Sequence, residues 1–240
     1  GYANDSINSH LEKAIRLYEK YTGDISDSST QQRYFIQWSK AMFEVVKASH
    51  SEDLDSIKEL YKIALNPLSP TLFIASAMLK GAIEFAQGRF SVSKLTHEEA
   101  LPYYDYNEHH DILANFSFDA GITLDLMQSL NLWFLGDDEL SQYHLNKAVE
   151  YCEITDLVTD KTHTYNYCAF LYVFKKDLDK TYYFADKCLK LAELHQHEVW
   201  IAHAKVLLGW VQCHKGNFDD GLSMIDVGYK AYDATGGIGH

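Results

Sequence analysis

Histidines are the residues of this sequence that most readily suggest chemistry. The densest group is HQHEVWIAH, from His195 to His203, and a second group is His109-His110-Asp111. A zinc-binding helix needs two imidazoles one turn apart, as in His-Glu-x-x-His. His197 and His203 are six positions apart, so they do not share a helix face, and His195 falls in a predicted turn. We therefore expect structural or surface histidines, no bound cofactor and no metal ligands. A metal or small-molecule sensor is the alternative.

Paired acids are the second candidate for chemistry. They occur as Glu98-Glu99, Asp137-Asp138 and Asp219-Asp220. Each pair lies at a predicted turn or helix start, where the helix macrodipole favours negative charge. General acid and base work needs carboxylates in a pocket that shifts their pKa values, and nothing in the sequence indicates one. The chain also lacks a phosphate-binding Gly-x-x-x-x-Gly-Lys-Ser/Thr loop and a Gly-x-Ser-x-Gly elbow. We predict no catalytic residue, and an enzyme is the least favoured interpretation.

Composition narrows the class of protein further. A net charge of −13 repels a phosphate backbone, so nucleic-acid binding is not expected. No apolar run reaches about 18 residues, so no membrane span is expected. The four cysteines form no Cys-x-x-Cys pair and suit a reducing cytoplasm. The sequence begins Gly-Tyr-Ala-Asn without a methionine, and we expect a piece of a longer protein.

A repeat runs through the chain. The stretches HLNKAVEYCE, FADKCLKLAE and MIDVGYKAYD begin at a constant spacing and place a small residue at Ala148, Cys188 and Gly228. Twelve positions before these come Gly136, Lys176 and Gly216. The same frame extends back through Gly88 with Ala100, then Leu60 and Ala14, with successive spacings of 46, 40, 48, 40 and 40. A period held this well predicts one structural unit used several times.

Each unit has the pattern of two helices joined by a tight turn. Apolar residues recur at helical spacing on both sides of Gly136-Asp137-Asp138, where glycine suits a helix end and aspartate the next N-cap. We predict similar turns at Gly88, Lys176 and Gly216. The fold is therefore all-α, with a lone helix near 6–21 followed by five hairpins. We expect one repeat domain over 1–237, weaker over 1–66 and clearer over 70–237, with 238–240 as a tail.

These motifs resemble the tetratricopeptide repeat (TPR), although the usual period of about 34 is exceeded here. More narrowly, the chain resembles the TPR-like region of large bacterial signalling ATPases. Their output domain is a class III adenylate/guanylate cyclase or a helix-turn-helix transcriptional regulator. The matching features are the turn Gly88, Tyr104-Asp105, the aromatic-x-x-Asp-x-Gly turn from Phe116 to Gly121, and Trp133 to Gly136. The ATPase and cyclase motifs themselves are absent from this sequence.

The resemblance implies a right-handed superhelix, or α-solenoid, of five to six antiparallel helix hairpins. It also implies a regulatory scaffold that binds protein, with a nucleotide-cyclase parent slightly preferred to a transcriptional regulator. The partner is then a protein or peptide segment, either separate or within the parent. Self-association through an exposed terminal helix stays open as a further mode.

Two sets of residues are candidates for contacting a partner. The first is an insertion from Pro102 to Gly121, which lengthens one repeat by eight residues and is rich in aromatic and polar side chains. Its candidates are Tyr103, Tyr104, Tyr106, His109 and His110. The alternative is that this segment only extends its hairpin. The second set lies on the first helices of the hairpins, which line the groove of a TPR superhelix. It consists of Gln37, Trp38, Asn131, Tyr165, Asn166, Trp200 and His203. The sequence leaves open which of these face a groove and which are core.

The repeat makes a prediction about packing. Ala148 is expected at the crossing point of two helices, where a larger side chain does not fit. Ala148→Leu should lower the free energy of unfolding by about 1–3 kcal/mol, the usual cost of overpacking. Urea unfolding followed by circular dichroism measures this, and an unchanged transition would show that the register is wrong.

Overall fold

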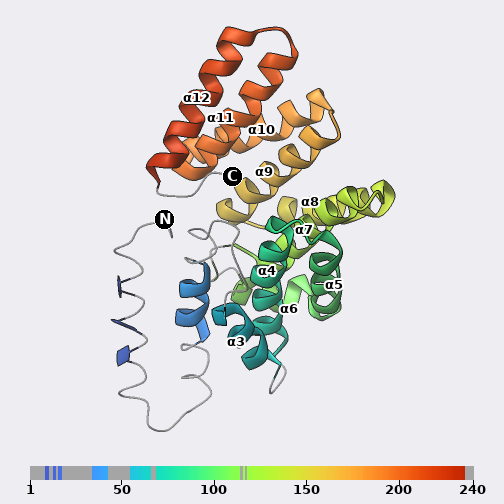
Figure 1. The fold of residues 1–240 in the computed structure, drawn as a ribbon, viewed down its shortest axis with the longest axis vertical. Helices are drawn as coiled ribbons and strands as arrows, with labels where there is room; N and C mark the ends of the chain where they lie inside the picture. The colour runs from blue at the N-terminus through green and yellow to red at the C-terminus, as the bar shows by residue number, and fades with distance from the viewer. Residues whose placement is uncertain are drawn as a thin grey trace. The chain divides into compact units, whose positions relative to one another are not determined.

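The computed structural model describes residues 9–10, 13–14, 16–17, 34–42, 55–65, 69–113, 116 and 118–235. It divides into two compact units, Gly1–Gly136 and Asp137–His240, called the first and second unit below. The named elements are α-helices and one short 3-10 helix, so the predicted all-α class is confirmed (Figure 1). The boundary falls in the predicted turn after Gly136. A single repeat domain over 1–237 stays a prediction, and its tail at 238–240 lies outside the described residues.

The first unit contains a helix over 34–42 and five named α-helices. These are α3 (Asp55–Ala64), α4 (Pro70–Ala86), α5 (Phe90–Ala100), α6 (Tyr106–Leu113) and α7 (Ala120–Phe134), with the 3-10 helix η1 (Leu101–Tyr103) after α5. Helix α7 packs on both α4 and α5. Of the helix predicted near 6–21, the described positions 9–10, 13–14 and 16–17 are helical, and the others lie outside the described residues.

The insertion is neither a loop nor a longer hairpin, because it forms a helix of its own, α6. Helix α5 stops at Ala100, and Pro102 occupies one of the first two positions of η1. Proline has no N–H to donate and its ring clashes with the preceding turn, so the α-helix cannot continue through it. The chain then restarts as α6, which contacts α4 and α7.

Trp38 lies in the core of the first unit. Its side chain has 0% exposure, and the indole Nε1 donates a hydrogen bond to the carbonyl of Ala75 at 3.3 Å. The ring of Phe116 packs edge-on against it, with centroids 4.9 Å apart. The prediction that Trp38 contacts a partner is therefore corrected, since its side chain holds the 34–42 helix against α4.

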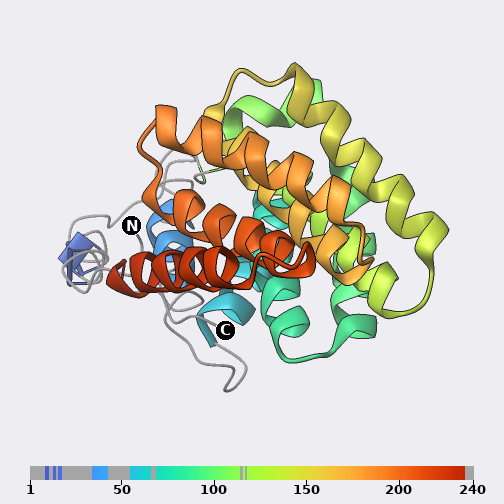
Figure 2. The same cartoon turned by 90° about the horizontal axis from the view of Figure 1, so that it is seen from above.

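The second unit is built on a regular spacing of helices. They are α8 (Asp138–Ile154), α9 (Val158–Phe174), α10 (Leu178–Leu194), α11 (Glu198–His214) and α12 (Phe218–Ala234). All five have the same length and begin at a constant step along the chain. Two such steps make one period of the sequence repeat. Each helix packs on the next, and Figures 1 and 2 both show α11 and α12 side by side.

Three helices of the second unit, α9, α10 and α11, end in one backbone motif. At the end of α10, Gln196 has φ +57° and the N–H of His197 donates to the carbonyl of Ala192 at 2.8 Å, which is a Schellman closure. The same closure follows α4, α9 and α11. The left-handed residues there are Gly88, Lys176 and Gly216. Gly136 also has a positive φ, of +87°. The four turns predicted from sequence are confirmed, and Gln196 adds a fifth.

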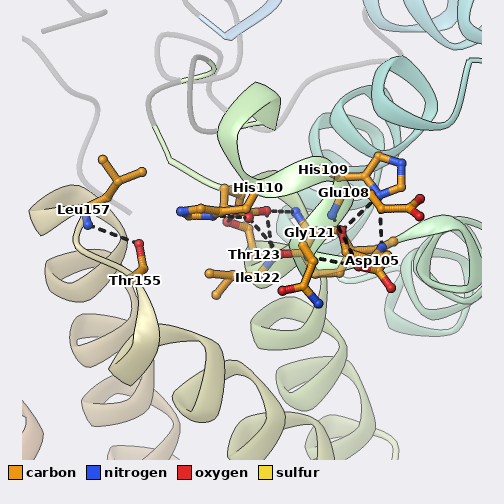
Figure 3. Close-up of polar contacts among 12 residues, drawn as sticks. Asp105, Glu108, His109, His110, Gly121, Ile122, Thr123, Thr155 and Leu157 are labelled. Carbon is orange, nitrogen blue, oxygen red and sulfur yellow. Dashed lines mark hydrogen bonds and ion pairs between the residues drawn. The ribbon is translucent and has the colours of Figure 1, made fainter.

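The connection from α8 to α9 is built differently. Thr155 is extended, with ψ 146°, and its hydroxyl accepts a hydrogen bond from the N–H of Leu157 at 3.1 Å (Figure 3). A threonine side chain thus takes over the closing bond that the left-handed residue allows elsewhere.

Of the six predicted small positions, Ala14 is partly buried and the other five are buried. Ala148 and Cys188 are fully buried, as are Ala100 and, with 1% exposure, Leu60. At Gly228 an added Cβ would lie 2.6 Å from the carbonyl oxygen of Ala202, so α11 and α12 are in contact through their backbones. Glycine permits this approach, which no larger residue would allow without separating the helices.

Replacing the left-handed residue of a non-glycine turn by glycine should stabilise the protein. Gln196→Gly should raise the free energy of unfolding by about 1 kcal/mol, because the left-handed conformation costs a Cβ-bearing residue about that much. The matched control is Gly216→Ala, at φ +88° with no atom within 4 Å of the new Cβ. Its free energy of unfolding should fall by a similar amount. Urea unfolding of both variants measures these changes. A destabilised Gln196→Gly protein would contradict the assigned turn.

Candidate functional site

Asp119 is the buried centre of the insertion. Its Oδ1 accepts hydrogen bonds from the N–H groups of Gly121 at 2.7 Å and Ile122 at 3.3 Å, which makes Asp119 the N-cap of α7. Its exposure is 1%. Figure 3 shows polar contacts around His110 and the start of α7, where Gly121, Ile122 and Thr123 each donate to Asp119. The aspartate of the aromatic-x-x-Asp-x-Gly motif therefore begins a helix.

The other carboxylate oxygen of Asp119 ties the insertion to this helix start. Oδ2 accepts a hydrogen bond from the Tyr104 hydroxyl at 2.7 Å and lies 2.7 Å from Nδ1 of His110. Because an ionised carboxylate only accepts, the imidazole donates from Nδ1. An added Cβ at Gly121 would lie 2.2 Å from the Tyr104 ring, so that ring lies directly against the backbone of α7 at this glycine. We call Tyr104, His110, Asp119 and Gly121 the insertion clamp.

The remaining candidates of the insertion are also largely engaged with their neighbours. Tyr106 stacks on His110 with ring centroids 4.5 Å apart. Nδ1 of His109 lies 3.0 Å from the carbonyl oxygen of Asp105. Tyr103 is 42% exposed, and its ring meets Phe73 edge-on. Tyr104 and His110 are partly buried and bonded within the fold, while Tyr103 keeps an accessible ring, and contact of these residues with a partner stays a prediction.

A second concentration of candidates lies in the second unit, where α9, α11 and α12 bring ring side chains together. It consists of His163, Asn166, Tyr167, Trp200, His203 and Tyr232, and we call it the ring cluster. His163 contacts Tyr167 and Trp200, with centroids 4.6 and 5.4 Å apart. His203 contacts Trp200 at 5.7 Å and Tyr232 at 4.8 Å. Nδ2 of Asn166 lies 3.4 Å from Nδ1 of His203.

The repeat explains why these side chains meet. His163 and His203 are separated by one full period, so they hold the same position in successive repeats. Asn166 follows His163 by three residues, and Trp200 precedes His203 by three, so each pair lies on one helix face. Helices α9 and α11 are in contact, which brings the two faces together.

The ring cluster is an uncharged environment at neutral pH. Burial, with a smaller contribution from His203, lowers the pKa of His163 to about 3. Burial alone lowers the pKa of His203 to about 4, and burial raises the pKa of Tyr232. Burial is the largest cause of all three shifts. Both imidazoles are therefore neutral at pH 7 and can donate from only one ring nitrogen each.

Two other predicted groove residues are core. Asn131 has 0% exposure, and its Nδ2 donates to Oγ of Ser93 at 2.9 Å, joining α7 to α5. Tyr165 is 5% exposed and donates to Oε1 of Glu153 at 3.1 Å. Their burial corrects the prediction that they are available to a partner. Gln37 is partly buried, as are Trp200 and His203, while Asn166 is 6% exposed.

Sequence reasoning missed three members of the ring cluster, His163, Tyr167 and Tyr232. A signal for the first was present, because the repeat period relates His163 to the predicted His203. For Tyr232 the sequence gives no such signal. Its meeting with His203 depends on the backbone contact between α11 and α12, which spacing alone does not reveal.

The other candidate chemistries find no support in the geometry. Over the described ranges, no three His, Cys, Asp or Glu side chains come close enough to hold a metal ion. The rings of His195 and His197 are 6.2 Å apart. Burial raises the pKa of the Cys152 thiol to about 11 and that of Cys188 to about 12, so neither forms a thiolate readily. None of the helices in the described part has the length and apolar character required to cross a bilayer.

Comparisons with known proteins bear on the fold. No family model matches the chain, and no curated protein matches it. The crystal structure of BtubC (BKLC) from P. vanneervenii is similar, with a TM-score of 0.63 and 14% sequence identity over 97% of this chain and 92% of that one. At this identity the likeness concerns the fold alone, and it agrees with an all-helical protein.

The buried imidazoles predict how stability depends on pH. An imidazole with a lowered pKa in the folded protein binds its proton more readily when the chain unfolds. The free energy of unfolding therefore falls as pH drops from about 6.5 towards 3. Between pH 7 and 5, the wild type should lose up to about 2 kcal/mol more than His163→Phe, which keeps a ring but cannot titrate.

Urea unfolding at the two pH values measures this difference. His195→Gln, which removes an exposed imidazole from the same unit, is the matched control and should behave as the wild type does. An equal loss in the wild type and His163→Phe would show that His163 is not buried in its neutral form.

Proposed function

We propose that this chain is a protein-interaction module, a TPR-like right-handed superhelix that binds a peptide segment of a partner or of its own parent protein. The observation that carries the proposal is the ring cluster. Trp200, His203 and Tyr232 are only partly buried and come from two helices, while the buried Asn166 of a third helix contacts His203. Three of these four residues were predicted as groove residues.

The regular helices of the second unit support a superhelical scaffold. Five helices of equal length advance by a constant step, and α9 contacts α11 as well as α10. This pattern of neighbour and next-neighbour contacts is typical of α-solenoids, whose first helices line a binding surface. The likeness to BtubC supports a helical fold of similar extent and says nothing about a partner.

Aromatic and imidazole rings suit the task of binding a peptide. Tryptophan and tyrosine bury a large apolar area, keep a polar handle and lose little conformational entropy when they are immobilised. The polypeptide backbone supplies matching donors and acceptors at regular intervals. The scaffold thus needs no reactive side chain, and binding biases the conformation of a parent protein by its differential affinity for two states.

The parent in this proposal is a cytoplasmic signalling protein, a nucleotide cyclase or alternatively a helix-turn-helix transcriptional regulator. This part depends on the family resemblance of the sequence. The reading frame upstream of Gly1 tests it. A P-loop ATPase with a cyclase domain would support the first, a helix-turn-helix domain the second, and neither would contradict both.

The proposal predicts that the chain selects peptides by sequence. A displayed random peptide library, selected on the purified chain, should yield peptides with dissociation constants of about 1–100 μM, a range usual for segments that incur an ordering cost on binding. Fluorescence anisotropy of labelled peptides measures the affinity. Scrambled peptides of the same composition are the control, and equal binding of both, or no selected peptide, would reject the function.

A further inference from the structure

The ring cluster contains polar hydrogens that no protein atom accepts. Within the part of the chain that the structure describes, Nε1–H of Trp200 and the hydroxyl of Tyr232 make no hydrogen bond. Both atoms are accessible to solvent. An indole N–H donates and never accepts. The cluster therefore offers at least one fixed donor beside partly exposed rings.

His203 adds a second donor if its proton is on the outer nitrogen. The amide nitrogen of Asn166 faces Nδ1 of His203 at 3.4 Å, and an amide NH₂ group only donates. Nδ1 is then the acceptor, and a neutral imidazole must carry its hydrogen on Nε2. Over the described residues His203 makes no other hydrogen bond, and its Nε2 is not a buried atom.

The amide of Asn166 is held against His203 although its oxygen is left unpaired. Asn166 is 6% exposed, and its Oδ1 is buried without a hydrogen-bond partner. A buried carbonyl oxygen without a hydrogen bond lowers the stability of the fold, so this amide is present despite a cost in stability. Holding His203 in one tautomer is a role that accounts for its position.

The missing partner group must accept hydrogen bonds and carry no charge. Burial lowers the pKa of His163 to about 3 and that of His203 to about 4, so both imidazoles are neutral at pH 7. An anion would thus find no cation in the cluster, on a chain whose net charge is −13. A main-chain carbonyl oxygen can accept from the N–H donors, and an adjoining apolar side chain can pack on the rings.

We propose that the ring cluster binds an uncharged peptide segment whose carbonyl oxygens accept hydrogen bonds from Nε1 of Trp200 and Nε2 of His203, with an adjoining apolar side chain packed on Tyr232. Asn166 is a positioning residue, since it acts through the tautomer of His203. This inference rests on the proposed peptide-binding function and names the chemistry of the segment.

The first measurement is the tautomer of His203. Long-range proton–nitrogen NMR spectra of the ¹⁵N-labelled chain at pH 7 distinguish a protonated Nε2 from a protonated Nδ1, with His203→Phe to assign the signals. We expect the Nε2–H form in the wild type, and a mixture of tautomers in Asn166→Leu. A wild-type ring with its hydrogen on Nδ1 would overturn the proposal.

The second measurement is binding of a minimal probe, N-acetyl-phenylalanine methylamide, which has two carbonyl groups, one apolar ring and no charge. Titration should produce saturable shifts of the Trp200 indole and His203 ring signals. Trp200→Phe, His203→Phe and Asn166→Leu should each weaken binding by about fivefold, as expected for one neutral hydrogen bond. Trp210→Phe is the matched control, because Trp210 is also a partly buried tryptophan of α11 but stacks on His214 outside the cluster.

Sodium acetate at equal ionic strength tests the competing ligand class. Saturable shifts with acetate but not with the amide would replace the uncharged peptide by an anion and overturn the proposal. Absence of saturation with the amide up to its solubility would also overturn it. If library-selected peptides bind the wild type, Trp200→Phe and His203→Phe equally well, the interaction function stands and the ring cluster is not its site.

Discussion

The second unit depends on one backbone constraint, the way its helices end. After α9, α10 and α11 a single residue turns into the left-handed conformation, and the next N–H bonds back to the carbonyl five residues earlier. The closure satisfies carbonyls that a helix end would otherwise leave unpaired. It also fixes the connection at three residues between helices of equal length, so that the chain advances by a constant step.

A constant step gives each helix face a fixed set of neighbours. Residues one period apart then hold equivalent places, as His163 and His203 do, and small residues recur where helices cross. At Gly228 the helices approach until their backbones touch, which brings Tyr232 to His203. The ring cluster is thus a consequence of the repeat and needs no irregular segment to form.

The insertion clamp and the ring cluster use polar groups in opposite ways. Asp119 accepts hydrogen bonds on both carboxylate oxygens and is buried, so its bonding capacity is used in joining α6 and α7. In the ring cluster, donors remain open to solvent beside aromatic surface. The insertion is the segment rich in aromatic and polar residues, but the donors that remain open to solvent lie in the regular repeats.

The period, the turns and the small crossing residues follow from the sequence alone, because they depend on local backbone rules. Gly88, Lys176 and Gly216 mark helix ends whatever surrounds them. Pro102 indicates the break before α6, although the length of the insertion is also compatible with a longer hairpin. Exposure, in contrast, does not follow from the sequence. Trp38, Asn131 and Tyr165 have the same polar or aromatic character as Trp200 and His203.

These residues differ in how deeply they are buried, and the helices that pack against each of them determine its burial. Trp38 faces α4, and Asn131 faces α5, because contacts between separate helices turn those faces inward. The sequence by itself determined that this chain is all-helical and where several of its helices end, since helix ends and small residues act locally. Only the tertiary structure decided which rings meet and which donors stay open, because those depend on side chains that distant helices bring together.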